Sequence, residues 1–406
     1  MRIIQYLKRN GIKHVWDIIW QYKLDLFLQK LLLFFLRYRP LKDIIMIESH
    51  NDFDCNGGAF YDYLIQEGYN EKYKIIWILK HPEDRPLVLP ENVGWVPLYR
   101  PSLKKAYYVC MAKFFTADNS VTGKVRKEQK SFYLTHGAFG LKKVKGKAKI
   151  PASVDYILSL SEKYTAILAE QLSIEYPSKR FVCLGYPTLD ILNRSDRSEL
   201  DKITQDSFEK VFLWMPTFRK GGGFRRNDST EEQKLGIPLI DTIEQYYELN
   251  DYLNEKNALM IIKIHPMQDL DTLKVKDQTN IRVLTGETVK KRGIDNYRLM
   301  ACSDALISDY SSAAYEYLQL NRPIAYVLSD EKEYKLGFVV DDIRALIAGD
   351  LIYSFIEMKE FIQNIIFEND NAMEKRIKLR EDIYKYHDDQ NCKRLVDFMG
   401  LSCNKN

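Results

Sequence analysis

The sequence predicts an α/β protein built from two lobes, each with a parallel β-sheet wound by helices. The chain of 406 residues is too long for a domain with one ordinary hydrophobic core. Its length suits two domains of about 100 to 200 residues each. After Pro40, short apolar runs alternate with longer helical patterns, which is typical of parallel strands joined by helices. A hydrophobic fraction of 46% supplies the apolar surface that two cores need.

The apolar runs form two sets, separated by a charged stretch at 194–210 that we interpret as a linker with a short helix. The first set predicts strands at 44–47, 74–79, 113–117, 131–135, 156–160 and 181–184. The second set predicts strands at 211–215, 259–264, 281–284, 305–307 and 324–328. Helical sequence at 356–399 is a candidate to cross back over the first lobe. The predicted divisions are an N-terminal segment (1–40), two Rossmann-like lobes (41–195 and 196–375) and a C-terminal helical segment (376–406).

Residues 1–40 combine positive charge with large apolar side chains. They carry eight Lys and Arg against two Asp, a net charge of +6, whereas the whole chain carries +4. The longest apolar run, 31–36, is far shorter than the roughly 20 residues of a membrane-spanning helix. We interpret the segment as an amphipathic helix that lies on an anionic membrane surface. The same pattern leaves open a helix packed on the protein's own core or in a homo-oligomer interface.

Cysteine spacing and the first residues predict the compartment. The six cysteines lack the short paired spacings of metal sites and disulfide frameworks, so we expect thiols in a reducing compartment. Charges such as Lys8, Arg9 and Lys13 interrupt the apolar residues near the start, and no small-residue cleavage site follows, so we expect no signal peptide. The prediction is a peripheral protein on the cytoplasmic face of the cell membrane, with no nucleic-acid partner.

Four motifs follow predicted strands, at the edge of the sheet where ligands of parallel α/β proteins gather. The first is Thr135-His136-Gly137. A histidine here titrates near neutrality and can accept a proton from an attacking hydroxyl, so His136 is our candidate general base. Gly137 would let a phosphate or acceptor approach the main chain, although a histidine that caps a helix remains the alternative. The loop that follows is rich in lysine, with Lys142, Lys143, Lys145, Lys147 and Lys149.

The second motif is Pro216-Thr217-Phe218-Arg219, which precedes Lys220 and three glycines. The planar guanidinium of Arg219 suits phosphate oxygens, and the glycines would let the following loop close over a ligand. A basic loop that is merely solvated is the alternative.

The third motif is Lys263-Ile264-His265-Pro266. Strand alternation places Lys263 and His265 on the same side, where His265 could hold a diphosphate oxygen and stabilise a leaving nucleotide. The same His-Pro pair at His81-Pro82 has no such context, so the motif alone is only suggestive.

The fourth motif is Ser308-Asp309-Tyr310-Ser311-Ser312, which precedes a helical pattern at 313–318. Hydroxyls and unpaired N–H groups at a helix N-terminus form an anion site that could seat a pyrophosphate. An ordinary Ser or Asp helix cap is the alternative.

In order and spacing, these four motifs resemble those of the CDP-glycerol glycerophosphotransferases of teichoic acid and capsule synthesis. The resemblance runs over residues 44–342. It implies a GT-B-like fold with a cleft between the lobes. It also implies a transferase that moves glycerol phosphate, or a related polyol phosphate, from CDP-glycerol to a polyprenyl-diphosphate-linked or polymer acceptor.

The resemblance assigns roles to residues of this chain. The family's catalytic base corresponds to His136. The second catalytic candidate, His265, comes from its position after a strand, where it could assist departure of the nucleotide. The motifs that bind the CDP-linked donor correspond to Pro216, Thr217, Lys263, His265, Ser311 and Ser312, and Arg219 fits the same cluster. From the strand-end motifs themselves we add Gly137, Ser308 and Asp309 to the candidate donor-binding residues.

Two departures from the family pattern concern the first lobe. The family commonly reads Gly-Thr-Pro-Leu-Lys after the histidine, whereas this chain has Gly137-Ala138-Phe139-Gly140-Leu141-Lys142, one residue longer. It also has Pro187-Thr188 where the family often has Pro-Arg, which could alter the phosphate grip or the polyol donor.

We expect no cofactor and no obligatory metal, since positive side chains and a helix start could stabilise the diphosphate. Three alternatives stay open. One is a ribitol phosphate donor, the second is a glycosyltransferase that uses a nucleotide sugar, and the third is an inactive scaffold of a polymer-synthesis complex.

Overall fold

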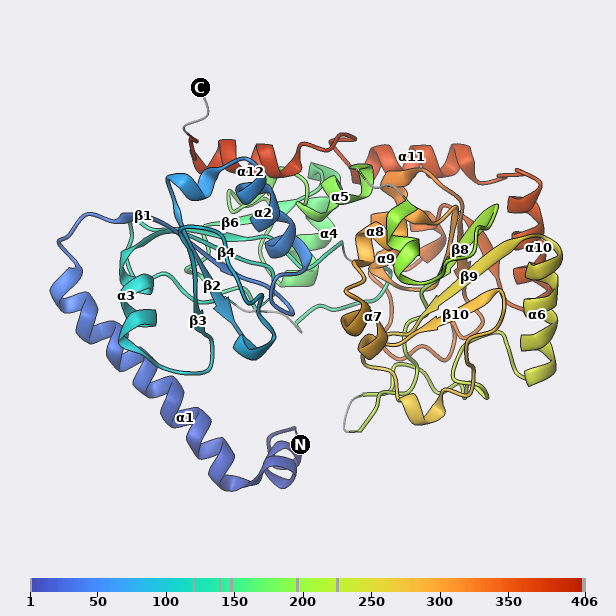
Figure 1. The fold of residues 1–406 in the computed structure, drawn as a ribbon, viewed down its shortest axis with the longest axis horizontal. Helices are drawn as coiled ribbons and strands as arrows, with labels where there is room; N and C mark the ends of the chain where they lie inside the picture. The colour runs from blue at the N-terminus through green and yellow to red at the C-terminus, as the bar shows by residue number, and fades with distance from the viewer. Residues whose placement is uncertain are drawn as a thin grey trace.

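The computed structural model describes residues 2–119, 121–138, 140–146, 149–194, 197–223 and 226–403. It confirms the predicted fold class, with two α/β lobes that lie side by side (Figure 1). Both sheets are parallel throughout the pairings between their strands.

The first lobe contains a seven-stranded sheet with the order β3-β2-β1-β4-β5-β6-β7. The order reverses at β1, so the loops after β1 and β4 diverge there and leave room for functional side chains. The strands are β1 (Lys42–Glu48), β2 (Lys74–Leu79), β3 (Val93–Pro97), β4 (Ala112–Ala117), β5 (Lys130–Tyr133), β6 (Tyr156–Ser159) and β7 (Phe181–Cys183).

The second lobe contains a six-stranded sheet with the order β10-β9-β8-β11-β12-β13. Here the order reverses at β8. The strands are β8 (Lys210–Trp214), β9 (Ala258–Lys263), β10 (Ile281–Leu284), β11 (Ala305–Ser308), β12 (Ile324–Val327) and β13 (Asp350–Ile352).

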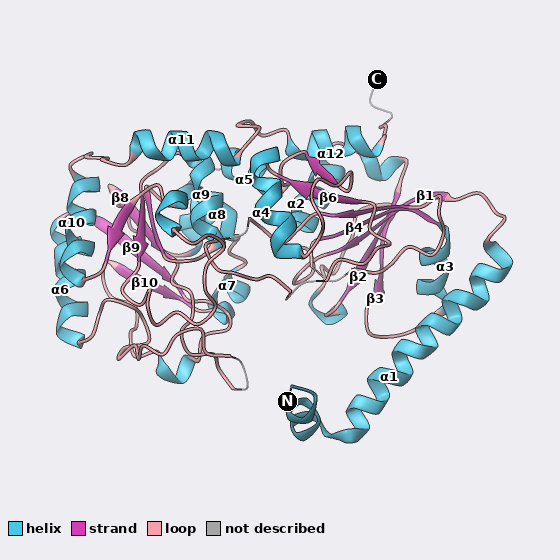
Figure 2. Ribbon diagram, turned by 180° about the vertical axis from the view of Figure 1, so that it is seen from behind, coloured by secondary structure: helices cyan, strands magenta, loops and turns pink. Residues whose placement is uncertain are grey.

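Helices cover both sheets (Figure 2). In the first lobe they are α1 (Arg2–Leu36), α2 (Cys55–Gln66), α3 (Leu103–Met111), α4 (Glu162–Leu172) and α5 (Thr188–Arg194). In the second lobe and beyond they are α6 (Ile243–Glu255), α7 (Gly286–Arg292), α8 (Asn296–Cys302), α9 (Ser312–Tyr317), α10 (Phe355–Ile366), α11 (Met373–Ile383) and α12 (Asn391–Met399). Short 3₁₀ turns are η1 (Tyr69–Glu71), η2 (Pro82–Asp84), η3 (Arg197–Lys202), η4 (Leu270–Thr272), η5 (Leu318–Leu320) and η6 (Ile343–Leu346).

The central strands are buried on both faces, which explains why they are continuous apolar runs in the sequence. All six residues of β9 are buried, and so are residues 44–48 of β1. The two strands that the sequence analysis missed, β3 and β13, lie at sheet edges. Strand β3 contains Gly94 and Pro97 and is only partly buried, while β13 has three residues, so neither has a clear apolar run.

Helix α1 rests on the first lobe through one side only. Leu32, Leu33 and Leu36 pack against a core that includes residues of α3. The Lys105 ammonium of α3 lies 2.8 Å from the carboxylate of Asp25, and both side chains are largely buried. The helix bends at Gly11, which has a φ of 78°. No helix in the described residues is long and apolar enough to cross a membrane.

The C-terminal helices return to the first lobe, as the sequence analysis suggested. Figure 1 shows α11 and α12, in red, passing along one side of both lobes. Asp190 of α5 fastens α12, because its carboxylate accepts the N–H groups of Asn391 (2.9 Å) and Cys392 (2.8 Å) and the Asn391 amide. The division of the chain at 40, 195 and 375 stays a prediction.

We predict that Asp190→Ala destabilises the protein, because three buried donors at the start of α12 lose their acceptor. The expected loss is about 3 kcal/mol of unfolding free energy, measured by urea or thermal unfolding. The control is Asp397→Ala, which removes an exposed carboxylate of α12 that pairs with Lys393 and should change stability little. Equal stabilities of the two variants would contradict this role for Asp190.

Candidate active site

A strained turn presents His136 at the carboxyl end of β5. Thr135 has a φ of 59°, which is unusual for a residue with a branched side chain. The buried Asn56 holds this turn, since its amide donates to the carbonyl oxygens of Leu134 (3.0 Å) and Thr135 (2.9 Å). The Asn56 carbonyl in turn accepts the N–H and O–H groups of Thr188. The strain is therefore fixed by α2 and α5 rather than by the loop itself.

A second histidine, His50, lies beside His136. The two rings are stacked, with centroids 5.7 Å apart and planes inclined by 17°. The Nδ1 atom of His50 lies 2.8 Å from the side-chain amide nitrogen of Asn119, which follows β4. Surrounding protein and then the neighbouring His50 lower the pKa of His136 below its ordinary value of 6.5. His136 is therefore neutral at pH 7, the form that accepts a proton.

In the second lobe, Lys263 at the end of β9 is a buried lysine without an anionic partner. Its side chain is 8% exposed, and within the described part of the chain no hydrogen bond or ion pair holds its ammonium. Burial alone lowers its pKa to about 8. An anion placed beside Lys263 would remove this desolvation penalty.

His265 follows Lys263 and has a fixed ring orientation. Its Nδ1 atom accepts the N–H of Met267 at 3.1 Å, so the neutral ring carries its proton on Nε2. The ring also packs on Phe218, with centroids 4.9 Å apart. Through Phe218, the second and third motifs are in direct contact.

We expected the Arg219 guanidinium to bind phosphate, but in the structure it is buried between two carboxylates. It is 2% exposed and lies between the carboxylates of Asp309 and Asp330. Its Nε and Nη2 atoms donate to Asp330 at 2.6 and 2.9 Å, and its Nη1 atom donates to Asp309 at 2.8 Å. The structure thus gives direct phosphate binding by Arg219 no support, because its donors are used to join the loops after β8, β11 and β12.

Thr217, Asp309 and Ser308 belong to the same framework. The N–H and O–H groups of Thr217 donate to Asp309 at 2.9 and 2.8 Å, and Pro216 beside it is buried. The Ser308 hydroxyl donates to the Met215 carbonyl at 3.3 Å. These residues hold the second and fourth motifs against each other, and their contact with a donor stays a prediction.

The fourth motif does begin a helix, as predicted, and Ser311 is its N-cap. The Ser311 hydroxyl accepts the N–H of Ala313 at 3.3 Å, and both Ser311 and Ser312 are partly exposed. Gly140 of the first lobe lies against this helix start, where a Cβ atom would come within 2.4 Å of the Tyr310 carbonyl. The two lobes are therefore in contact at the predicted pyrophosphate site.

The loop after His136 also pairs with the second lobe. The N–H of Lys143 donates to the Gly337 carbonyl at 3.0 Å, and the N–H of Val339 donates to the Leu141 carbonyl at 2.9 Å. Burial lowers the pKa of Lys142, which lies in this pairing. Phe139 and Lys147 lie outside the described residues.

Gly137 is required for a reason other than the one expected. Its φ is 121°, and a Cβ atom would lie 2.4 Å from Oε1 of Glu316, a residue of α9. A protein carboxylate, rather than a substrate, therefore fills the space beside Gly137. The structure also explains why this chain has Thr188 where the family often has an arginine. Thr188 is buried, and its hydroxyl donates to the side-chain oxygen of Asn56.

Sequence reasoning missed several residues of this site. His50 follows β1 and Asp330 follows β12 by a few residues, so the strand-end rule that found His136 could have found both. Asn56 and Glu316 lie inside helices and have no local signal.

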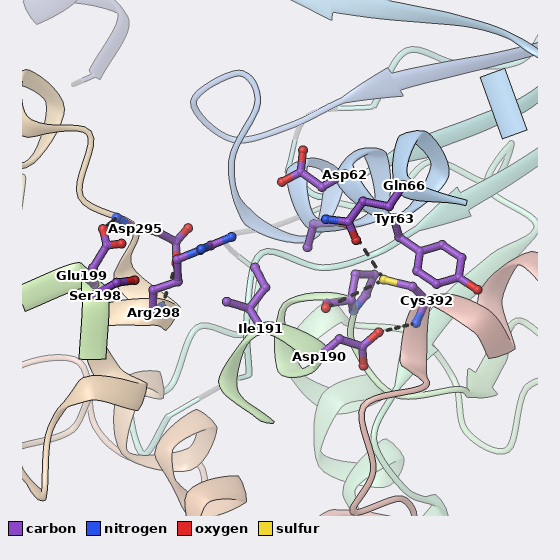
Figure 3. Close-up of a pocket in the computed structure, with 12 residues that line it drawn as sticks. Asp62, Tyr63, Gln66, Asp190, Ile191, Ser198, Glu199, Asp295, Arg298 and Cys392 are labelled. Atoms are coloured by element: carbon purple, nitrogen blue, oxygen red, sulfur yellow. Dashed lines mark hydrogen bonds between the residues drawn. The ribbon is translucent and has the colours of Figure 1, made fainter. Parts of the chain in front are cut away.

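A separate pocket between the lobes contains none of the predicted site residues. Asp62 and Tyr63 of α2, Asp295 and Arg298 near α8, and Cys392 of α12 are among the residues that line it (Figure 3). We assign it no role in the chemistry.

We predict that His136 titrates below pH 6.5 and that His50→Gln raises its pKa part of the way back. Removing an imidazole that can become charged makes protonation of His136 easier, whereas desolvation by the rest of the site remains. Histidine NMR titration, with His136→Asn to assign the signal, measures this, and remote His387 serves as the internal control. A His136 pKa that is unchanged by His50→Gln would contradict the prediction.

Comparisons with known proteins identify the family and the fold. The family described as CDP-glycerol:poly(glycerophosphate) glycerophosphotransferase matches residues 32–400. The teichoic acid glycerol-phosphate primase of Bacillus subtilis (strain 168) is 24% identical, over 90% of this chain and 94% of the primase. The teichoic acid poly(glycerol phosphate) polymerase of Bacillus spizizenii is 23% identical, over 73% of this chain and 77% of the polymerase. The structure of the wall teichoic acid polymerase TagF superposes with a TM-score of 0.71 at 20% identity and covers 97% of both chains, which confirms the GT-B-like fold. The chain therefore belongs to the CDP-glycerol:poly(glycerophosphate) glycerophosphotransferase family and is an enzyme of this type.

Proposed function

We propose that this glycerophosphotransferase moves glycerol phosphate from CDP-glycerol to a hydroxyl of a lipid-linked or polymer acceptor in teichoic acid synthesis and releases CMP. The observation that carries the proposal is Lys263, a buried ammonium with no protein anion beside it in the described residues. A diphosphate supplies the missing negative charge. Similarity to teichoic acid primases and polymerases supports the choice of donor and acceptor.

His136 acts as the general base in the proposed reaction. It removes the proton of the acceptor hydroxyl while that oxygen forms a bond to the phosphorus that bears the glycerol. The bond from this phosphorus to the bridging oxygen breaks, and CMP leaves with the electron pair. The lowered pKa of His136 keeps it in the unprotonated form at neutral pH.

Lys263 and His265 stabilise the charge that develops on the diphosphate. The ammonium supplies a positive charge, and the Nε2–H of His265 supplies a hydrogen bond of fixed direction. Ser311 and Ser312, at the start of α9, would bind remaining phosphate oxygens. Arg219 acts indirectly in this proposal, by holding Thr217 and Asp309 in place.

We further propose that no metal ion is required, because these groups can neutralise the diphosphate themselves. Among the described residues, His81, Glu83 and Asp84 form an exposed group that could hold an ion. The assay below therefore includes a chelator.

The first test is CMP release from CDP-glycerol, CDP-ribitol and UDP-sugars, with a short-chain lipid diphosphate disaccharide as acceptor. We expect CMP from CDP-glycerol, a loss of about 100-fold or more in His136→Ala, and unchanged release in EDTA. On the acid side, activity should persist below pH 6.5 and fall only as His136 becomes protonated. Release from CDP-ribitol alone would change the donor, and release of UDP would move the enzyme to the nucleotide-sugar class. A loss in EDTA that magnesium restores would contradict the metal-free proposal.

We also propose that α1 binds the enzyme to an anionic membrane surface. The helix buries Leu32, Leu33 and Leu36 against the first lobe. Large apolar side chains remain exposed elsewhere on it, including Trp16, Trp20, Phe27, Phe34 and Phe35. The exposed Lys23 and Lys30 lie between them in the sequence, and the exposed Arg37 follows the end of the helix. These positive charges suit anionic lipid headgroups.

Cosedimentation with vesicles tests this proposal. We expect binding to phosphatidylglycerol vesicles, weaker binding to phosphatidylcholine vesicles, and loss of binding in the triple variant Phe27→Gln, Phe34→Gln, Phe35→Gln. The control is Tyr247→Gln, which removes an exposed aromatic ring of α6. Unchanged vesicle binding by the triple variant would contradict the membrane role. The same holds if the triple substitution converts a dimer of this protein to a monomer without any effect on lipid binding.

A further inference from the structure

Glu316 connects the two halves of the proposed site. It lies on α9 of the second lobe, yet its Oε1 atom accepts the N–H of Ala138 in the first lobe at 3.0 Å. The Tyr297 hydroxyl of α8 donates to the same oxygen at 3.1 Å. The Glu316 side chain is buried, so these contacts are made in the absence of competing water.

The contact point is directly beside the proposed base. Ala138 is two residues after His136, and Gly137 between them leaves room for the carboxylate only because it has no Cβ. On the other side of His136, Asn56 holds the carbonyls of Leu134 and Thr135. The loop that carries His136 is therefore fixed at both ends, by Asn56 within its own lobe and by Glu316 from the other lobe.

The same short helix begins at the proposed donor site. Ser312 and Glu316 are four residues apart on α9, so they lie on the same side of the helix, one turn from each other. A shift of α9 on donor binding would move Glu316 together with Ser311 and Ser312. The loop of His136 would follow, because Ala138 and Gly140 both contact this helix or its start.

We propose that Glu316 is a positioning residue. Its contact with Ala138 fixes the His136 loop against α9, the proposed donor-binding helix, and so holds the base beside the donor site. The proposal rests on the proposed function, since it gives His136 and α9 the roles of base and donor site. It assigns Glu316 no direct contact with the substrate.

Several titratable groups face Glu316 and bear on the choice of variants. Burial raises the pKa of Glu316 to about 7, while the hydrogen bonds from Ala138 and Tyr297 lower it. Glutamine keeps the accepting oxygen without the charge, and therefore separates the two properties. The pKa of each neighbouring group is raised in part by Glu316, and these groups are Cys55, Tyr186, Tyr297 and Tyr384.

The kinetic test compares Glu316→Ala, Glu316→Gln and Tyr297→Phe in CMP release from CDP-glycerol. We expect Glu316→Ala to lower kcat by about 30-fold or more while KM for CDP-glycerol changes less than about threefold, because the base and not the donor is misplaced. Glu316→Gln should recover most of kcat, and Tyr297→Phe should stay near wild type because the Ala138 contact remains. The control is Glu255→Ala, an exposed glutamate at the end of α6. An unchanged kcat in Glu316→Ala, an equal loss in Glu316→Gln, or a loss confined to KM would overturn the proposal.

A second measurement needs no substrate and therefore separates this proposal from the proposed function. Histidine NMR of the full chain is expected to show a shifted His136 signal and a pKa closer to 6.5 in Glu316→Ala, but not in Glu316→Gln. His387 should titrate identically in all three proteins. If the wild type releases no CMP but His136 responds in this way, the donor is wrong and the positioning role stands. An identical His136 titration in wild type and Glu316→Ala would overturn the positioning role, whichever donor is used.

Discussion

The second lobe depends on a buried arginine held between two aspartates. Arg219 joins three loops, because Asp309 follows β11, Asp330 follows β12 and Arg219 itself follows β8. The rings of Tyr310 and Tyr334 pack against its guanidinium at 5.3 and 5.8 Å. Removing the arginine would leave two buried carboxylates without a counter-charge, a loss of about 3 to 5 kcal/mol. The ion pairs of Arg219 therefore fix the loops that carry the proposed donor-binding residues.

In the first lobe, neutral groups rather than ion pairs fix the loop that carries the candidate site residue. Asn56 uses both ends of its amide, donating to the turn before His136 and accepting from Thr188. This holds Thr135 in a left-handed conformation that would otherwise cost about 1 kcal/mol or more. Asn56 fixes this turn without adding a further charge to those of Lys80 and Asp54, which already lower and raise the pKa of His136.

Beside His136, main-chain contacts and one carboxylate join the two lobes. The loop after His136 pairs with residues 337–339, and Gly140 lies on the start of α9. The additional residue that this chain has in the loop, compared with the family pattern, falls in this segment. Glu316 completes the junction, which explains why a glycine must follow His136.

The class of fold and the positions of the motifs could be predicted from the residues alone. Buried parallel strands must be apolar on both faces, so residues 44–47 and 259–264 could be recognised as strands, and the residues that follow such strands must meet at one edge of a sheet. His136, Lys263 and His265 could be found in this way. The edge strands β3 and β13 could not, because a half-buried strand needs no continuous apolar run. The burial of Arg219 and the position of Glu316 beside Gly137 could not be predicted, because each depends on a contact that the folded chain makes between distant residues. Arg219 and Asp309 are 90 residues apart, and Ala138 and Glu316 are 178 residues apart.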